Sequence, residues 1–347
     1  MTNPIRTAAF ALMAGLMAPA AMAQEVTLRF QHFVSPNSAN PKYFIEPWAE
    51  KVEAESQGRI KVEIYPFMQL GGSAPEQYDL IVDGVIDGGW VIPGYQGGRF
   101  PKAEALELPF MVTKSAEEAS RAAWEYTQKH LVDDFADVHL IAAHMHGRGL
   151  VHKKGPAIET ATDLQGLKLR GPSRPATLLL DKLGATPIGM PVPQFPEALS
   201  KGVVDGGVIT WEMSPSLKLD ELTDSHTDVA GDKSLYNLYF LWAMNKQVYE
   251  GLPDDLRAII DANSGLETSA WAGRAHDTGD ADGKAVMAGA GNEIATLSEE
   301  ATAEIRSKGE EVIAEWIEEM NARGLPADQL VEDVRRLVAA TASQPEG

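Results

Sequence analysis

A short motif occurs twice in this chain and restricts the folds that the chain can adopt. Residues 84–92 read GVIDGGWVI, and residues 202–209 read GVVDGGVI. In each copy the first glycine is suited to end a helix, and the Asp-Gly pair is suited to a turn before an apolar strand. A glycine followed by a strand precedes each copy, at Gly58 and at Gly166. The repeated order predicts two α/β lobes, with a ligand cleft between them and closure about a hinge.

The spacing of apolar residues around both copies of the motif also predicts alternating strands and helices. Alternating or short apolar runs predict strands, and three-to-four-residue spacing predicts helices between them. We expect strands over 26–30, 60–65, 88–92, 139–144 and 167–170, and helices over 41–56, 75–82, 174–183 and 196–200. Later in the chain, Pro253 suits the first position of a helix and Ser298 suits an N-cap.

Composition excludes several functional classes. The 347 residues include no cysteine, which excludes a disulfide scaffold, a thiolate zinc site, an iron–sulfur cluster and a cysteine nucleophile. Lys and Arg number 30 against 50 Asp and Glu, and the formal charge of −20 argues against binding to nucleic acid. An anionic ligand would have to be held by a local cation that overcomes this acidic field.

The first 23 residues have the pattern of a cleaved secretory signal peptide. Arg6 supplies the positive start, residues 8–17 form an apolar run, and residues 21–23 read Ala-Met-Ala, a typical cleavage site. The run is too short to span a bilayer, and Pro19 interrupts it. We therefore expect residues 1–23 to be removed and the mature chain to begin near Gln24 as a soluble protein of the periplasm.

The chain lacks the usual signatures of catalysis. It has no phosphate-binding loop, no GxGxxG after a strand, no nucleophile elbow and no HExxH. We expect no catalytic residue, no cofactor and no metal. Two groupings leave alternatives: His144 and His146 would share a strand face and serve a metal with His152, and Asp205 with Glu212 would act as acid and base.

Arg170 is the strongest candidate for binding a ligand. It ends an apolar strand, and Gly171 and Pro172 then break that strand. Ligands of open α/β sheets bind at the carboxyl ends of strands, where a guanidinium grips a carboxylate bidentately. The alternative is a salt bridge to one of the many acidic residues, and the residues alone do not decide between the two.

The matched segments together resemble the DctP-type substrate-binding proteins of TRAP (tripartite ATP-independent periplasmic) transporters. The resemblance covers nearly the whole mature chain, in order, and rests on FQHFVSPNSANPKYFIEPWAEKVEAESQGRIKVEIYPFMQLGG, GVIDGGWVIPGYQGGRFPKAEALELPFM, TDLQGLKLRGPS, LGATPIGMPVPQFPEALSKGVVDGG and AMNKQVYEGLPDDLR. It implies a two-lobe periplasmic binding protein fold with a long hinge-spanning helix near the C-terminus. It also implies a binding function without catalysis, in which a ligand is delivered to a membrane permease.

The resemblance assigns roles to particular residues. The family's signature arginine corresponds to Arg170, which implies that this residue anchors a ligand carboxylate. The second contact falls on His146 or Arg148. Many members carry Gln-Glu-Asn after the "VDG" turn, where this chain has Gly207-Val208-Ile209, so the usual amide contact is missing. The remaining expected ligand-binding residues are Trp90, Tyr95, Trp211, Glu212, His32, Phe33, Asn37, Met190 and Gln194.

The resemblance also divides the chain and defines its function. We expect lobe I over 24–147 plus about 233–275, and lobe II over 148–232 plus about 276–347. The expected function is a monomeric periplasmic receptor that binds a hydroxy, keto, sugar or aromatic carboxylate and passes it to TRAP permease subunits. The alternative ligand is an amine or zwitterion boxed by Trp90 and Trp211, with Glu212 as counter-charge.

Overall fold

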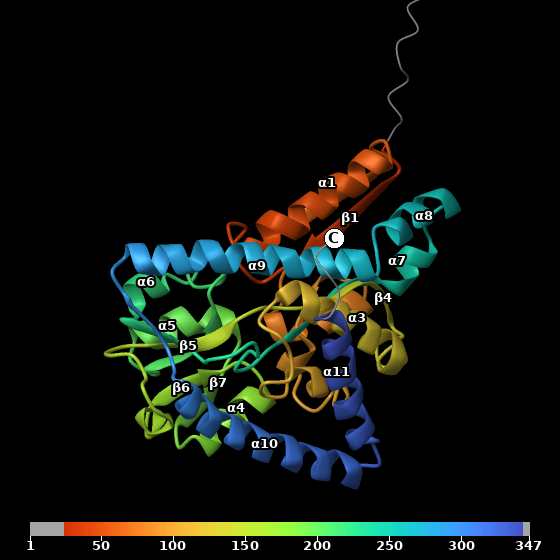
Figure 1. Cartoon of the computed structure of the whole chain (residues 1–347). Coiled ribbons are helices and arrows are strands. Elements are labelled where there is room, and N and C mark those ends of the chain that lie inside the picture. The colour runs from red at the N-terminus through yellow and green to blue at the C-terminus, as the bar shows by residue number, and fades with distance from the viewer. Residues whose placement is uncertain (1–23, 343–347) are drawn as a thin grey trace, which may run out of the picture.

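Residues 24–342 are described by the computed structural model, and they form two lobes that each contain one β-sheet (Figure 1). The expected signal peptide lies outside the described residues. The first sheet has the strand order β2-β1-β3-β10-β4 and the second has the order β11-β9-β5-β8-β6-β7. Within residues 24–342, no helix is long and apolar enough to cross a membrane.

The first sheet is mixed. Strands β2 and β3 both pair in parallel with β1, and β10 pairs antiparallel with β3 and β4. Its strands are β1 (Val26–Gln31), β2 (Ile60–Tyr65), β3 (Gly88–Val91), β4 (Val138–Met145) and β10 (Tyr239–Asn245). The helices packed with it are η1 (Pro41–Ile45), α1 (Glu46–Glu55), η2 (Ala74–Glu76), α2 (Gln77–Val82), η3 (Pro93–Tyr95), η4 (Ala103–Glu107), α3 (Ala116–His130), α7 (Lys246–Glu250) and α8 (Asp254–Ala262).

The second sheet repeats this arrangement and adds one edge strand. Strands β7 and β8 pair in parallel with β6, and β5 pairs antiparallel with β8 and β9. Its strands are β5 (Gly149–Lys153), β6 (Lys168–Gly171), β7 (Thr186–Gly189), β8 (Gly206–Thr210), β9 (Ser225–Asp228) and β11 (Glu293–Thr296). Its shorter helices are η5 (Ala161–Leu164), α4 (Arg174–Lys182), η6 (Val192–Gln194), α5 (Phe195–Ser200) and α6 (Leu219–Leu222).

The sequence repeat corresponds to a structural repeat, in a different register from the expected one. The unit β1-α1-β2-α2-β3 matches β6-α4-β7-α5-β8 in pairing and order. The strand after Gly166 therefore corresponds to β1, whereas the strand after Gly58 corresponds to the one after Gly184. The expected pairing of Gly58 with Gly166 is wrong because Gly58 precedes the second strand of its unit and Gly166 precedes the first strand of its unit.

The aspartates of the repeat explain why the motif recurs. Asp87 Oδ2 accepts a hydrogen bond from the backbone N–H of Arg29 on β1 at 2.8 Å. Asp205 Oδ2 accepts one from the backbone N–H of Lys168 on β6 at 2.9 Å. Each carboxylate thus satisfies a backbone donor of the parallel neighbour just before the motif strand begins. The Asp-Gly turn fixes the register of the strand whose carboxyl end faces the other lobe.

Two chain crossings and one helix join the lobes. The chain passes from β4 in the first sheet to β5 in the second, and later from β9 back to β10. Helix α9 (Leu266–Gly289) lies across both lobes in Figure 1 and contacts α3 and β4 on one side and α6 and β11 on the other. The structure therefore confirms the long hinge-spanning helix and the two-lobe fold.

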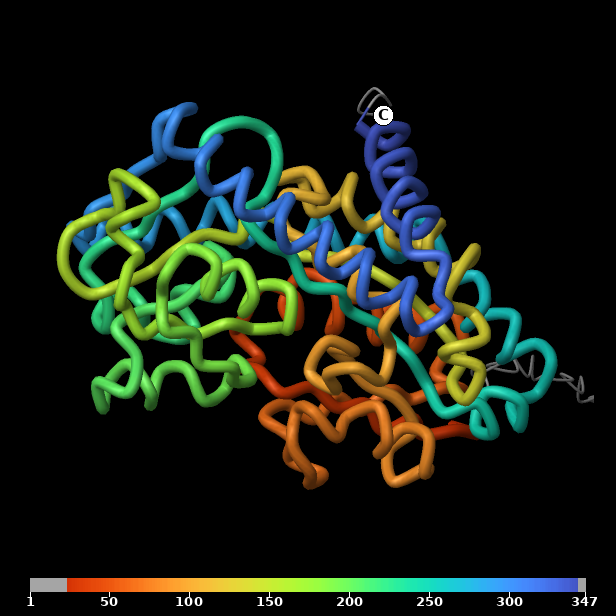
Figure 2. Tube along the Cα trace, turned by 90° about the horizontal axis from the view of Figure 1, so that it is seen from below, coloured from red at the N-terminus to blue at the C-terminus, as the bar shows by residue number. Residues whose placement is uncertain are grey.

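The C-terminal helices return the chain to the first lobe. Helix α10 (Glu299–Ala322) packs against α4, and Figure 2 shows it running toward the first lobe, where α11 (Ala327–Thr341) packs against α3. The expected assignment of 276–347 to lobe II does not hold for α11, because its apolar face packs into the core of the first lobe.

The helix starts expected at Ser298 and Pro253 differ in outcome. Ser298 caps α10 as expected, and its Oγ accepts a hydrogen bond from the Ala301 N–H at 3.1 Å. Pro253 precedes α8 rather than occupying its first position.

Candidate functional site

A small cavity of about 30 Å³ lies between the lobes, where the carboxyl ends of β3, β6 and β8 meet. Residues of both lobes and of the segment that enters β10 line it. Its apolar lining consists of Phe33, Val34, Trp90, Ile92, Val192, Ile209, Met213, Leu238 and Phe240. Its polar lining consists of Tyr95, His146, Arg170, Thr210, Glu212 and Tyr236. The structure thus brings together six expected site residues: Phe33, Trp90, Tyr95, His146, Arg170 and Glu212.

Arg170 is fully buried at the end of β6 and is held by backbone carbonyls. Its Nε donates to Met190 O at 3.0 Å, and its Nη1 donates to Val208 O at 2.9 Å. Its Nη2 has no hydrogen-bond partner. No carboxylate of the described chain forms an ion pair with Arg170, so the salt-bridge alternative is not what the structure shows. A buried guanidinium without a counter-ion, but fixed by two bonds, is suited to receive an anion.

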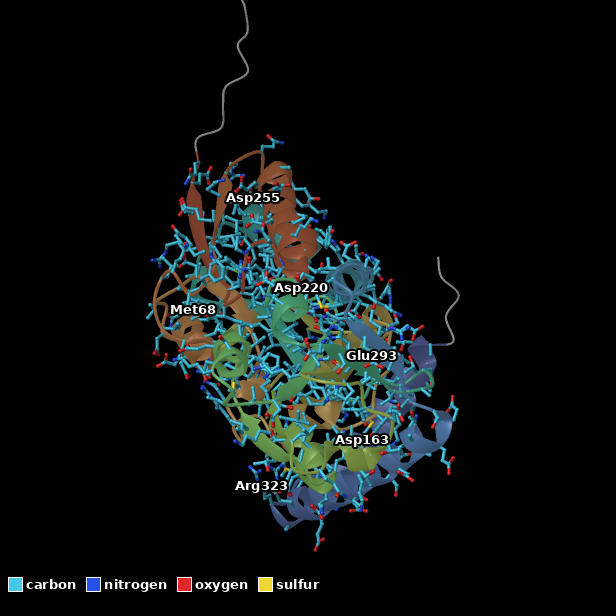
Figure 3. All side chains as sticks on the ribbon, turned by 90° about the vertical axis from the view of Figure 1, so that its left-hand side faces the viewer. Met68, Asp163, Asp220, Asp255, Glu293 and Arg323 are labelled. Carbon is cyan, nitrogen blue, oxygen red and sulfur yellow. The ribbon has the colours of Figure 1, made fainter. Side chains whose placement is uncertain are left out.

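Among the described residues, Glu212 is the acidic side chain that lines the cavity, and the other acidic side chains lie outside its lining. Figure 3 shows Asp163, Asp255 and Glu293 at the surface, and all three are exposed. Water and salt screen charges at such positions, whereas the field of a buried cation is screened much less. Arg170 therefore provides the local positive field that an anionic ligand needs.

One wall of the cavity is a stack of aromatic rings. The Trp90 ring lies parallel to that of Phe33, with centroids 5.0 Å apart, and nearly parallel to that of Phe240 at 4.9 Å. The Trp90 Nε1–H donates to His144 Nε2 at 2.9 Å, which fixes the indole. The Tyr95 ring contacts that of Phe33 at a tilted angle. The Tyr95 hydroxyl oxygen accepts a hydrogen bond from the backbone N–H of Val192, in the other lobe, at 3.0 Å. These planar surfaces favour a flat apolar group.

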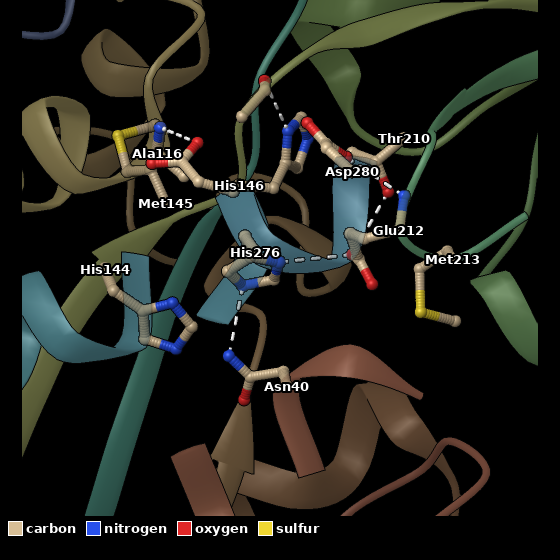
Figure 4. A network of polar contacts seen from close by, with 12 residues as sticks. Asn40, Ala116, His144, Met145, His146, Thr210, Glu212, Met213, His276 and Asp280 are labelled. Carbon is tan, nitrogen blue, oxygen red and sulfur yellow. Dashed lines mark hydrogen bonds and ion pairs between the residues drawn. The ribbon is translucent and has the colours of Figure 1, made fainter. Parts of the chain in front are cut away.

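Buried polar groups occupy a further part of the lining (Figure 4). His146 Nδ1 lies 3.1 Å from Gly147 O, and burial lowers the pKa of His146 to about 3, so the ring is neutral. Glu212 Oε1 accepts bonds from Thr210 Oγ1 at 3.1 Å and His276 Nδ1 at 3.2 Å. His146 Nε2 and Glu212 Oε2 have no partner.

Four of the expected site residues lie away from the cavity for local geometric reasons. Asn37 is exposed in a turn, and Gln194 is exposed at the end of η6. Met190 contributes its carbonyl to Arg170, but its side chain does not line the cavity. His32 is buried just after β1 and does not line the cavity, whereas Phe33 and Val34, in the bend that follows it, do.

Trp211 and Arg148 lie on a separate, open groove beside α9. Trp211 packs against His152 and His226, with ring centroids 5.5 and 5.4 Å away. Gly283 of α9 has no side chain where Trp211 O passes, and a β-carbon there would lie 2.0 Å from that oxygen. This close approach directs Trp211 into the core of the second lobe and Glu212 into the cavity. Arg148 pairs with Asp228 at 3.1 Å and is half exposed, so the choice between His146 and Arg148 falls on His146.

The separation of Trp90 from Trp211 bears on the amine-ligand alternative, and the positions of the histidines bear on the metal-site alternative. Trp90 lines the cavity and Trp211 does not, so these two tryptophans do not box a cation together. Among residues 24–342, no group of three or more His, Asp or Glu side chains is arranged to hold a metal ion. His144 binds Trp90, His146 faces the cavity, and His152 contacts His226 in the second sheet.

Several lining residues were not anticipated from the sequence. Tyr236, Leu238 and Phe240 come from the segment that enters β10, which crosses between the lobes. His276 of α9 reaches Glu212 from the hinge helix. The aromatic run YNLYFLW at 236–242 was the available signal, since a fully buried strand rich in aromatic residues at a lobe crossing is placed to contribute to the cleft.

Comparison with known proteins gives the family. Residues 30–319 match the bacterial extracellular solute-binding protein family 7, DctP. A TRAP solute-binding protein from Rhodoferax ferrireducens T118, solved with copurified benzoate, is 46% identical, with a TM-score of 0.89 and coverage of 91% of this chain and 98% of that chain. A marine metagenome TRAP solute-binding protein specific for aromatic acids, solved with 3-hydroxybenzoate, is 44% identical, with a TM-score of 0.90 and coverage of 92% and 99%.

A curated relative agrees with these structures. The C4-dicarboxylate-binding periplasmic protein DctP of Rhodobacter capsulatus is 26% identical over 91% of this chain and 92% of its own length. The family consists of periplasmic transport receptors rather than enzymes. The family match and the two-lobe fold shared with these structures lead to one identification: the chain is a TRAP transporter solute-binding protein of the DctP family.

Proposed function

We propose that this receptor binds a monocyclic aromatic carboxylate in the cavity between its lobes. One observation carries the proposal: Arg170 is buried, free of any carboxylate partner in the described chain, and has Nη2 unpaired beside a wall of stacked rings. The ligand carboxylate binds the guanidinium of Arg170, and the ligand ring packs against Trp90 and Phe240. The benzoate and 3-hydroxybenzoate of the two similar structures have this combination of an anionic end and a flat apolar ring.

The lining of the cavity supports an aromatic acid over a sugar acid. The cavity of about 30 Å³ is well below the range of about 300–1,000 Å³ for ligand pockets, so a ligand must displace lining side chains, most of which are apolar. A sugar acid would place several hydroxyl groups against side chains that cannot form hydrogen bonds, which is unfavourable. A dicarboxylate would bring a second charge without a second free cation in the lining.

The cellular role follows from this binding. Residues 1–23 act as a signal peptide that directs export, and the mature receptor is a periplasmic monomer. Tyr95 and Val192 meet across the lobes in the present form, so this form is the closed one in which a ligand is enclosed. The closed surface is then offered to the TRAP permease subunits, and opening about the crossings and α9 releases the ligand.

Calorimetry on protein freed of copurified ligand tests the proposal. The panel is benzoate, succinate, glucuronate and benzylamine, and we expect micromolar or tighter binding of benzoate, equivalent to about −8 kcal/mol or more. The other three ligands should bind at least a hundredfold more weakly. Binding of benzylamine without binding of benzoate would refute the carboxylate assignment, and mass spectrometry of the copurified ligand provides an independent check.

A further inference from the structure

His146 presents an unused hydrogen-bond acceptor to the cavity. Its Nδ1 lies 3.1 Å from Gly147 O, and a carbonyl oxygen only accepts, so Nδ1 carries the proton. In the neutral ring, Nε2 then carries no proton and has a lone pair that can accept a hydrogen bond. This nitrogen belongs to a side chain that is 1% exposed, and it has no partner among the described residues. The tautomer is therefore fixed by the backbone, and the free atom can only receive a hydrogen bond.

Glu212 presents a second acceptor of the same kind. Asn40 Nδ2 donates to His276 Nε2 at 3.2 Å, so the proton of His276 lies on Nδ1 and is donated to Glu212 Oε1. Thr210 Oγ1 donates to the same oxygen. Oε2 remains without a partner, although the side chain is only 5% exposed (Figure 4).

The position of this carboxylate is fixed by the hinge helix. Asp280 Oδ1 accepts the backbone N–H of Glu212 at 3.0 Å. Gly279 lies directly beneath, where an added β-carbon would be 2.8 Å from Glu212 Cβ. Burial raises the pKa of Asp280 well above its usual value. Glu212 therefore cannot turn away to find water, and its free oxygen stays in the cavity.

Resting on the proposed function, we propose that the receptor selects aromatic acids that carry a hydroxyl group, whose proton is accepted by Glu212 Oε2 or His146 Nε2 while Arg170 holds the carboxylate. An aromatic acid without a hydroxyl would cover both acceptors and leave them desolvated and unpaired. A buried polar group left in that state is costly, and specificity arises from this penalty as much as from the new bond.

Calorimetry with matched ligands tests this selectivity. The series consists of benzoate, the three monohydroxybenzoates and the three methoxybenzoates, because a methyl ether keeps the oxygen but removes the donor. We expect at least one hydroxybenzoate to bind about tenfold or more tightly than benzoate, equivalent to about 1.4 kcal/mol. We expect the matching methyl ether to lose this gain.

Two variants identify the acceptor. Glu212→Gln replaces the free oxygen with an amide that can donate, and His146→Phe removes the acceptor nitrogen. In at least one variant the ratio of hydroxybenzoate to benzoate affinity should fall close to one. Met213→Leu alters an apolar lining residue and serves as the matched control, for which the ratio should stay unchanged. His146→Gln replaces His146→Phe if thermal unfolding shows that the phenyl variant does not fold.

The outcomes separate this inference from the proposed function. If benzoate binds as tightly as every hydroxybenzoate, the selectivity is refuted while the receptor still binds aromatic acids. If the hydroxyl preference persists undiminished in both variants, the assignment of the acceptors is refuted. If no aromatic acid binds at all, the proposed function itself fails.

Discussion

Replacing Arg170 by Met removes the guanidinium and keeps an unbranched apolar stem of similar reach. The structure leaves Nη2 as the free donor, so the substitution removes at least one charge-assisted bond to the ligand carboxylate. Such a bond contributes about 1.5–3 kcal/mol, which corresponds to a weakening of about 10- to 150-fold. Arg170→Lys retains the charge. A single ammonium group cannot replace the planar guanidinium, whose separate nitrogens bind Met190 O and Val208 O and leave a third for the ligand. We therefore expect both variants to bind weakly.

The assay is calorimetric titration of benzoate into ligand-free protein, with thermal unfolding as a check of the fold. Arg170→Met leaves two buried carbonyls without donors and also removes a buried charge, so its stability has to be measured separately from its affinity. Lys168→Met, on the same strand but exposed, controls for the general loss of one positive charge. A folded Arg170→Met protein that binds benzoate within about threefold of the wild type would refute the anchoring role.

Three further predictions address closure, pH and packing. Tyr95→Phe removes the hydroxyl that accepts the Val192 N–H across the lobes, and we expect a several-fold faster ligand release in stopped-flow measurements. Burial raises the pKa of Glu107 from its usual 4.5 to about 8, so the folded protein binds this proton more tightly than the unfolded chain does. Stability from this group is complete below pH 4.5 and is lost as the pH rises through 8, and Glu107→Gln should flatten that decline in melting temperature. Gly207→Ala would place a β-carbon 2.7 Å from that of the anchoring arginine and should cost about 1–3 kcal/mol of stability and weaken binding.

Each of these predictions has a result that would contradict it. Unchanged release in Tyr95→Phe would show that the hydroxyl does not stabilise the closed form. An equally steep decline in Glu107→Gln would assign the pH dependence to other groups. Gly189→Ala is the control for Gly207→Ala, because Gly189 has open space around its α-carbon. Equal stability of the two alanine variants would refute the packing argument.

The fold was largely predictable because its signals are local. Helix ends, Asp-Gly turns and alternating strands are encoded within a few residues, and the predicted strands at 60–65 and 139–144 agree with the structure within two residues. The return of α11 to the first lobe was not predictable, since its apolar face is compatible with either lobe. The register of the repeat was also missed, because the similar motif sequences do not reveal which upstream strands pair with them.

The sequence by itself determined that two α/β lobes exist, that cysteine chemistry is absent and that an arginine ends a strand at the cleft. Only the tertiary structure decided which neighbours face inward. Glu212 enters the cavity and Trp211 leaves it because glycines of a helix some seventy residues later allow the backbone to approach closely. Contacts between distant segments fix side-chain direction, and a linear pattern carries no record of which segments meet. The free nitrogen of Arg170 and the two unpaired acceptors are likewise properties of the assembled cavity.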